Sequence, residues 1–311
     1  MVSQTNAAPA EQKDTRKGLL FALGAYGIWG SFPLIIHSLD FANPFEVVAW
    51  RIIFGLLLGI VMLTWARAWR PLLAVLKVKR LFWLLALSSA LIYVNWLVYV
   101  IGVSSGHIVE SSLGYFINPL VTVVLAVLFQ REKLSKFQWV AVALGALAVT
   151  VLTVDYGHLP LIALTLAISF GFYGLVKSKI GSQVTPLIGY SIETAMLVPL
   201  AAVQLFIVSG AVGVKFGTDG FYSWFGLALF GFLTAIPLIL FGSAAKNLPL
   251  AWVGFMQYLT PSIQFVLALT VFHEPMPAAR WIGFGIVWLG LATLMTPIVK
   301  ALLHSKSTTR N

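Results

Sequence analysis

The sequence predicts an all-α membrane protein in which ten transmembrane helices form two inverted five-helix repeats. Three observations support this prediction: an apolar composition, a series of apolar segments long enough to cross a bilayer, and a repeat that relates the two halves of the chain. Of the 311 residues, 59% are hydrophobic and 10% are charged, and the mean hydropathy is +0.93. A soluble domain carries about 25% charged residues, so a chain of this composition belongs in lipid.

A transmembrane helix needs about 20 mainly apolar residues to cross the hydrocarbon core. The polar residues 1–17 and 301–311 are expected to form terminal tails, and no stretch is left for a separate soluble domain. The segments that meet the length requirement are, in chain order, 18–37, 46–65, 81–103, 108–129, 137–154, 159–177, 186–209, 221–244, 249–272 and 280–299.

The second half of the chain repeats the first at an offset of 142 residues, the spacing between Pro119 and Pro261. Five helices are an odd number, so a second unit of the same kind must enter the membrane from the opposite side. We therefore expect one repeat over residues 18–155 and an inverted one over residues 156–300. The residues whose types return at this offset are Pro119, Val124, Leu125, Ala126, Glu132 and Trp139.

The distribution of charge predicts the orientation of these helices, because cytoplasmic loops carry an excess of Lys and Arg. With the N-terminus in the cytoplasm, only Lys215 and Arg280 of the 20 basic residues fall in outside segments, and Arg51 falls within a helix. We therefore expect a multi-pass protein of the plasma (inner) membrane with both termini cytoplasmic. The net charge of +10 reflects this orientation, and no nucleic-acid partner is expected.

The sequence lacks the motifs of several enzyme classes. It has no G-x-x-x-x-G-K-[ST] phosphate loop, no H-E-x-x-H, no G-x-S-x-G and no cysteine, and its five histidines lack metal-ligand spacing. We expect no ATP-driven transport, no cofactor, no metal site and no enzymatic activity. Repeated halves of this kind are typical of transporters that alternate access to one site. An intramembrane enzyme acting on lipid and a passive channel are the alternatives.

Two ionisable residues lie inside apolar segments, Arg51 in the second and Glu193 in the seventh, and the repeat makes them equivalent. A charge near the bilayer centre costs about 2.5–3.5 kcal/mol on insertion scales, so each is expected to face a cavity or a partner. Arg51 would attract an anionic group, and Glu193 would bind a cationic group or couple a proton. The alternatives are that Arg51 extends to the outer surface and that Glu193 is protonated or hydrogen-bonded.

The fourth and ninth segments carry matched prolines, Pro119 and Pro261, which are expected to kink them because proline lacks a backbone donor. Kinks with polar flanks at equivalent points of two repeats are typical of a transporter binding site. The alternative is that the kinks shape packing and the polar side chains join helices. The polar residues near the prolines that we assign to substrate binding are Tyr115, Asn118, Gln257 and Tyr258.

Asn95 and Trp96 lie near the middle of the third segment, and Trp29 lies in the first. An asparagine at that depth needs partners, and a tryptophan there is far from the usual interfacial belt. These residues are expected to line the substrate site as an aromatic wall, and core packing is the alternative. By contrast, Glu132 and Glu274, which follow the fourth and ninth segments, are expected to cap the start of a neighbouring helix.

Several motifs resemble one known group of membrane proteins, the EamA group of the drug/metabolite transporter superfamily, and within it the RarD branch. The resemblance covers nearly all ten helices. One departure is His273, where a glycine is common in the family, and it concerns the local loop geometry. The motifs that carry the resemblance are Asn95-Trp96, Glu110 to Pro119, Gln130 to Leu134, Phe137 to Trp139 with Gly145, Phe172 to Val176, Gln257-Tyr258 with Pro261, and Phe272 to Trp281 with Gly290.

The resemblance implies a bundle of two inverted five-helix repeats that moves small metabolites or drugs without ATP. We therefore expect a secondary transporter, in the exporting direction, whose partners are a small-molecule substrate and the lipid bilayer. A homo-oligomer is compatible with this layout.

Overall fold

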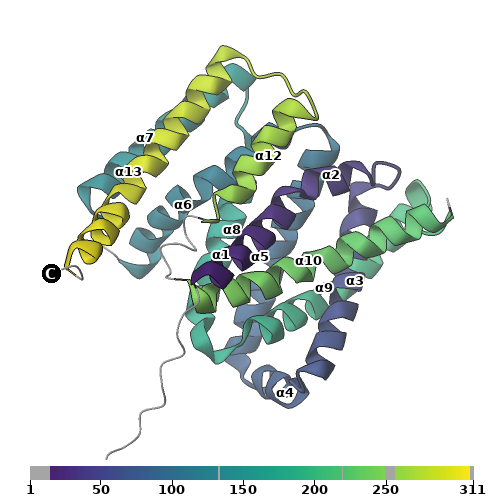
Figure 1. Ribbon diagram of the computed structural model, residues 1–311. Helices are drawn as coiled ribbons and strands as arrows, with labels where there is room; N and C mark the ends of the chain where they lie inside the picture. The colour runs from purple at the N-terminus through teal and green to yellow at the C-terminus, as the bar shows by residue number, and fades with distance from the viewer. Residues whose placement is uncertain (1–14, 132–133, 219, 249–255, 309–311) are drawn as a thin grey trace, which may run out of the picture.

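The computed structural model describes residues 15–131, 134–218, 220–248 and 256–308, and all regular structure within these residues is helical (Figure 1). Nine of the described helical segments are long and apolar enough to cross a membrane, and α12 is a shorter apolar helix. The predicted all-α membrane fold is confirmed. The elements are α1 (Thr15–Gly30), α2 (Phe32–His37), α3 (Pro44–Trp65), α4 (Trp69–Lys77), α5 (Lys79–Ser104), α6 (Ile108–Gln130), α7 (Lys136–Tyr156), α8 (Leu161–Ile180), η1 (Gly181–Gln183), α9 (Pro186–Ala211), α10 (Phe221–Asn247), α12 (Leu259–Thr270) and α13 (Ala278–Thr308).

The long helices coincide with the predicted segments, because each run of about 20 apolar residues is bounded by polar or helix-breaking residues. Two details differ. The first span is divided into α1 and α2, and the predicted segment 249–272 is described only from residue 256, with its later part forming α12.

The break between α1 and α2 brings an aromatic ring into the core. Ser31 lies between the two helices, and its Oγ donates a 2.8 Å hydrogen bond to the carbonyl of Ile28. Pro33 occupies the first turn of α2, where the missing N–H is not needed. Phe32, the first residue of α2, is 3% exposed and packs in the largest hydrophobic cluster.

Helix packing follows the repeat. The offset of 142 residues makes α3 equivalent to α9, α6 to α12 and α7 to α13, and each of these pairs packs together. Other contacts come in equivalent pairs: α1 packs on α10 as α8 packs on α5, and α12 packs on α1 as α6 packs on α8. Figure 1 shows α7 and α13 side by side at one edge of the bundle, with α3 and α9 toward the other.

Equivalent helices run antiparallel, as an inverted repeat requires. Glu46 in the first turn of α3 accepts a hydrogen bond from the backbone N–H of Lys215, which follows the end of α9. Asp155 at the end of α7 pairs with Arg280 at the start of α13 at 2.9 Å. The two halves of the chain are therefore arranged as inverted repeats.

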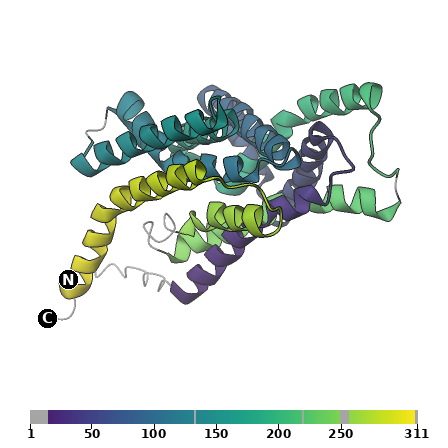
Figure 2. The same ribbon diagram turned by 90° about the horizontal axis from the view of Figure 1, so that it is seen from above.

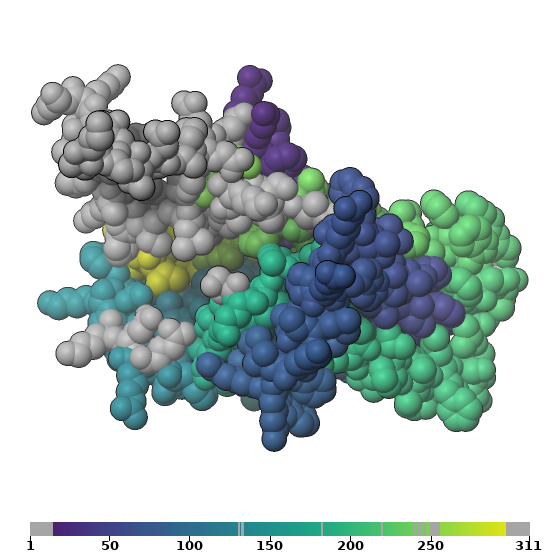
Figure 3. Space-filling model, turned by 90° about the horizontal axis from the view of Figure 1, so that it is seen from below, coloured from purple at the N-terminus to yellow at the C-terminus, as the bar shows by residue number. Residues whose placement is uncertain are grey.

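A short amphipathic helix, α4, lies in the connection between α3 and α5. Leu72 and Val75 face the bundle and pack in a hydrophobic cluster with Ile192 of α9, while Arg70 and Lys77 are exposed. Figure 3 shows α4 in blue at the molecular surface. This helix is not among the predicted segments, because its nine residues are far fewer than a membrane span needs.

The bundle has two chemically different ends. One end gathers the connections that follow α3, α6, α8 and α10, and we call it the basic end because it carries Arg67, Arg70, Lys77, Lys79 and Arg80. The opposite end is the acidic end, where Glu46, Glu110, Asp155 and Glu274 lie. Figure 2 shows the start of α1 and the end of α13 on the same side of the molecule.

Buried carboxylates tie together the acidic end. Glu46 is fully buried and accepts hydrogen bonds from the backbone N–H groups of Lys215 and Phe216, both at 2.9 Å. Glu110 of α6 accepts a 3.0 Å hydrogen bond from the N–H of Ile162, in the first turn of α8. These contacts join segments that are far apart in the chain and hold them together at the acidic end.

Glu274 forms a third such contact. It accepts hydrogen bonds from the backbone N–H groups of Ile108 and Val109 at the start of α6, the latter at 2.9 Å. The prediction that Glu274 caps a neighbouring helix is thus confirmed, while Glu132 lies outside the described residues. Burial raises the pKa of the Glu274 carboxyl above its ordinary value, although the two N–H groups favour its charged form.

The residues before these two glutamates share an unusual backbone. Arg131 and His273 are equivalent in the repeats and have φ angles of 57° and 51°, in the left-handed region. This conformation ends a helix and favours glycine, because a Cβ there crowds the following carbonyl oxygen. It explains why glycine would suit position 273.

Candidate functional site

The buried guanidinium of Arg51 is the centre of the candidate site. The side chain lies about two turns into α3 and is 4% exposed. Its Cζ lies 4.3 Å from the ring centroid of Trp96 in α5, 5.2 Å from Phe230 in α10 and 5.6 Å from Phe32 in α2. Aromatic faces attract a cation, so rings from three helices hold Arg51 inside the bundle rather than at the outer surface.

Several hydrogen-bonding atoms around Arg51 have no hydrogen-bond partner among the described residues. They include the Nε and Nη1 atoms of Arg51 itself and the hydroxyls of Tyr99 and Tyr190. Both tyrosines are more than nine-tenths buried and lie near Arg51, with the Tyr190 hydroxyl against Gly55, one turn further along α3. An unpaired buried polar group costs about 1–3 kcal/mol, more when charged, so this cluster is suited to a ligand that supplies acceptors.

The rings of Trp96, Phe230 and Phe32 around Arg51 form what we call the aromatic cage. A second polar group lies beside this cage. The Nδ2 of Asn95 donates to the Leu166 carbonyl and to Ser169 Oγ in α8, both at 3.1 Å. These bonds fix the amide, and its Oδ1 accepts a 3.1 Å hydrogen bond from the hydroxyl of Tyr115. The Tyr115 ring lies 5.7 Å from that of Tyr99, so Asn95 positions the aromatic side chains next to Arg51.

Glu193 lies in a separate network toward the basic end. It is 4% exposed and accepts hydrogen bonds from Ser88 Oγ, from the Tyr173 hydroxyl at 3.2 Å and from Lys177 Nζ at 2.7 Å. The Lys177 ammonium also lies 5.4 Å from the Tyr173 ring centroid. Glu193 is therefore ion-paired with a residue of α8, and Arg51 and Glu193 occupy different networks.

The other predicted site residues of the first repeat, Trp29 in α1 and Asn118 in α6, lie outside the cage. Trp29 packs 5.6 Å from the Tyr26 ring and 6.2 Å from the Phe241 ring, between α1 and α10. Asn118 is half-buried, and its Oδ1 faces Gly171 of α8 and has no hydrogen-bond partner within the described ranges.

In the ninth span, the predicted residues surround the start of α12. Gln257 is exposed, and Tyr258 is the residue before the helix. Pro261 lies in the first turn of α12, whereas Pro119 lies inside α6. A proline in a first turn removes no helical hydrogen bond. Pro261 therefore lies at the start of a helix, whereas Pro119 lies within one.

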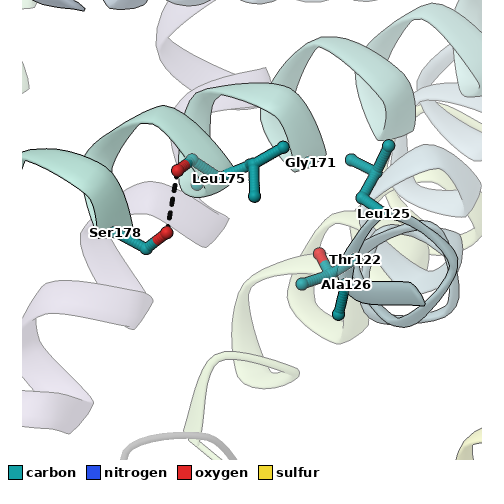
Figure 4. Close-up of a pocket in the computed structure, with 7 residues that line it drawn as sticks. Thr122, Leu125, Ala126, Gly171, Leu175 and Ser178 are labelled. Carbon is teal, nitrogen blue, oxygen red and sulfur yellow. Dashed lines mark hydrogen bonds between the residues drawn. The ribbon is translucent and has the colours of Figure 1, made fainter. Parts of the chain in front are cut away.

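A small pocket of about 100 Å³ opens between α6 and α8 on the side of the basic end. Figure 4 shows Thr122 and Ala126 of α6 facing Gly171, Leu175 and Ser178 of α8. It is lined mainly by small and apolar side chains, because glycines on α8 leave room between the helices. The helix order places Asn118 one turn deeper along α6.

Sequence reasoning missed most partners of the two charged residues. Phe32, Phe230, Tyr99 and Tyr190 around Arg51 look like ordinary core residues in the sequence. The repeat relates two of these contacts: Phe230 is 142 residues after Ser88, which is the partner of Glu193. Among the described residues, no group of three His, Cys, Asp or Glu side chains is placed to hold a metal ion.

Comparisons with known proteins agree with this architecture. The model of the EamA-like transporter family matches residues 16–154. Protein RarD of Streptomyces exfoliatus is 40% identical over 298 residues, which cover 95% of this chain and 93% of that protein. Protein RarD of Escherichia coli is 38% identical over 282 residues, covering 91% and 95%. An uncharacterized transporter of Vibrio cholerae is 36% identical over 291 residues, covering 94% and 96%.

A solved crystal structure shows the same fold. It superposes with a TM-score of 0.59 at 17% sequence identity and covers 90% of this chain and 96% of its own. At this identity the likeness concerns the fold alone. The sequence relatives extend over nearly the whole chain, so the chain belongs to the EamA-like transporter family, in the group that includes the proteins named RarD.

Proposed function

We propose that this protein is a secondary transporter that exports a small organic solute across the plasma (inner) membrane, without ATP, by alternating access of two inverted repeats. The observation that carries the proposal is the buried Arg51 with its unpartnered donors. A charge at this depth is expensive to keep, and a structural role would supply it with partners. A ligand that binds and is then released explains why the Nε and Nη1 donors of Arg51 have no partner among the described residues.

The two ends of the bundle support alternating access. Glu46, Glu110 and Glu274 tie segments together at the acidic end, while a pocket opens between α6 and α8 near the basic end. With both termini cytoplasmic, this arrangement corresponds to a carrier that is closed outside and accessible from inside. Movement of residues 18–155 against residues 156–300 would exchange the two states.

Glu193 is the proposed coupling residue. It forms an ion pair with Lys177, and a proton arriving at the carboxylate would weaken that pair. Release of Lys177 would loosen the contact between α8 and α9. Proton binding would in this way favour one state of the carrier, as the sequence led us to expect. Trp29, Asn118, Gln257 and Tyr258 stay proposed contacts of the substrate in other states of the cycle.

Counter-flow in proteoliposomes tests the proposal. Purified protein would be reconstituted with a panel of organic acids, amines, amino acids and drugs inside, and the labelled compounds would be added outside. We expect saturable uptake that the internal compound stimulates, with Arg51→Gln inactive and the exposed-site control Lys215→Gln active. Flux that rises linearly with concentration would indicate a channel instead, and lipid turnover by the purified protein would indicate an enzyme.

A further inference from the structure

We infer that the substrate carries a single carboxylate on an apolar or aromatic body, and that Arg51 binds this carboxylate. The inference rests on the proposed function and names the chemical class of its substrate. It starts from the charges inside the described bundle. Glu193 and Lys177 neutralise each other at 2.7 Å, which leaves the positive charge of Arg51 without an ionic partner. A monoanion balances that charge.

The contacts that Arg51 does make cannot replace an anion. Trp96, Phe230 and Phe32 attract the cation through their ring faces. A guanidinium has N–H donors in its plane, and each needs a lone pair. The Nε and Nη1 donors of Arg51 find none in the part of the chain that the structure describes. A carboxylate offers two oxygens in the planar arrangement that suits a guanidinium.

The nearby hydroxyls indicate the same ligand. Tyr99 and Tyr190 are 3% and 8% exposed; the Tyr99 hydroxyl has no hydrogen-bond partner among the described residues, and the Tyr190 hydroxyl has only the Thr194 side chain nearby. Both hydroxyls can donate to the oxygens of a carboxylate that binds Arg51. Two side-chain acceptors of the bundle already have donors of their own. Asn95 Oδ1 accepts from Tyr115, and the Glu193 carboxylate accepts from three donors.

The side chains around Arg51 indicate the chemistry of the rest of the substrate. Trp96 and Tyr115 are half-buried, while Phe32 and Phe230 are almost fully buried, so the surface beside the guanidinium is aromatic. Burying an apolar group against such a surface is favourable. A phosphate monoester is a poorer match, because its charge near −2 would exceed the single positive charge available.

Three probes that share a phenyl body and differ in the head group test this inference: 3-phenylpropionate, its neutral amide and 3-phenylpropan-1-amine, which is cationic. Binding to the full-length protein in lipid nanodiscs would be measured as the concentration that shifts thermal unfolding, followed by tryptophan fluorescence. We expect the carboxylate to act at a concentration at least tenfold lower than the amide or the amine. Arg51→Gln should reduce this preference below twofold, while Lys215→Gln should preserve it.

A second pair of variants protects the test against misfolding of the arginine variant. Tyr99→Phe removes a hydroxyl without a hydrogen-bond partner in the described part of the chain, and Tyr190→Phe removes one that only the Thr194 side chain approaches, so folding should be retained while carboxylate binding weakens about threefold or more. The inference fails if the amide or amine binds as well as the carboxylate, if the preference survives in Arg51→Gln, or if no probe shifts unfolding. The carrier proposal is separate, because the counter-flow panel also contains amines and neutral drugs.

Discussion

Ser88 and Phe230 occupy equivalent positions in the two repeats, and each contacts the buried charged residue of the other repeat. Ser88 donates a hydrogen bond to Glu193, and the ring of Phe230 lies 5.2 Å from Cζ of Arg51. The pseudo-symmetry therefore preserves the contact while its chemistry differs. One repeat builds a polar pocket that pairs its charge, and the other builds an aromatic cage that leaves hydrogen-bond donors free.

Replacing Arg51 with methionine should make the protein more stable and inactive. The change removes an unpartnered buried charge and keeps the apolar stem, so we expect the free energy of unfolding to rise by about 1–3 kcal/mol. Thermal unfolding in detergent measures this effect. The matched control is Arg280→Met, which breaks the pair with Asp155 and should lower stability. Loss of stability in Arg51→Met would indicate that the cage is structural.

Glu193→Gln should remove the response to a proton gradient. Glutamine keeps the shape of the side chain but cannot be ionised, so exchange of substrate should continue while transport no longer depends on pH. Counter-flow with and without an imposed gradient measures both properties. Lys177→Met is the companion variant, since it should impair coupling by removing the other half of the ion pair. Unchanged gradient dependence in Glu193→Gln would exclude this residue as the coupling site.

Stability should depend on pH through Glu274. Because burial raises the pKa of this carboxyl, the folded state binds its proton more tightly than the unfolded state does. The resulting stabilisation is complete below the ordinary value of 4.5 and is lost as the pH rises through the raised pKa. Glu274→Gln should flatten this part of the profile, and Asp40→Asn, an exposed change at the same end, should leave it intact. Unfolding midpoints between pH 4 and 8 provide the measurement.

His273→Gly should stabilise the protein by about 1 kcal/mol, because the left-handed conformation at φ 51° strains any residue with a Cβ. Arg131→Gly, at the equivalent position with φ 57°, should act in the same direction. His273→Ala is the control, since it removes the imidazole but keeps the Cβ. Equal stabilities of the alanine and glycine variants would show that the backbone is not the source of strain.

Much of the fold could be predicted from the sequence, because the length of an apolar run and the basic residues that flank it indicate a membrane helix. The cap formed by Glu274 was also predictable from its repeat and its position. The break at Ser31 and the helix α4 depend on local hydrogen bonding and on burial of Leu72, which no apolar run reveals.

The site was predictable only in part. Arg51, Trp96, Asn95 and Tyr115 were singled out by polarity or size at depth, and the structure links them through the cage and through the Asn95–Tyr115 hydrogen bond. Lys177 ends the sixth predicted segment and received no role in the site, because the sequence does not show that its long side chain extends from the last turn of α8 to Glu193. Pairs such as Lys177 and Glu193 form between different helices, and the sequence does not show which helices pack together.

Alternating access itself can be measured directly, because the natural chain contains no cysteine. Single cysteines would replace Phe216, which stacks on Trp50 at the acidic end, and Ser178, which lines the pocket near the basic end. A membrane-impermeant maleimide would then be applied to each, with and without Glu274→Ala, which releases the contact between Glu274 and α6. We predict that this release increases labelling at position 216 and decreases labelling at position 178. Labelling at 178 that stays constant while 216 becomes reactive would contradict a carrier whose two ends open in alternation.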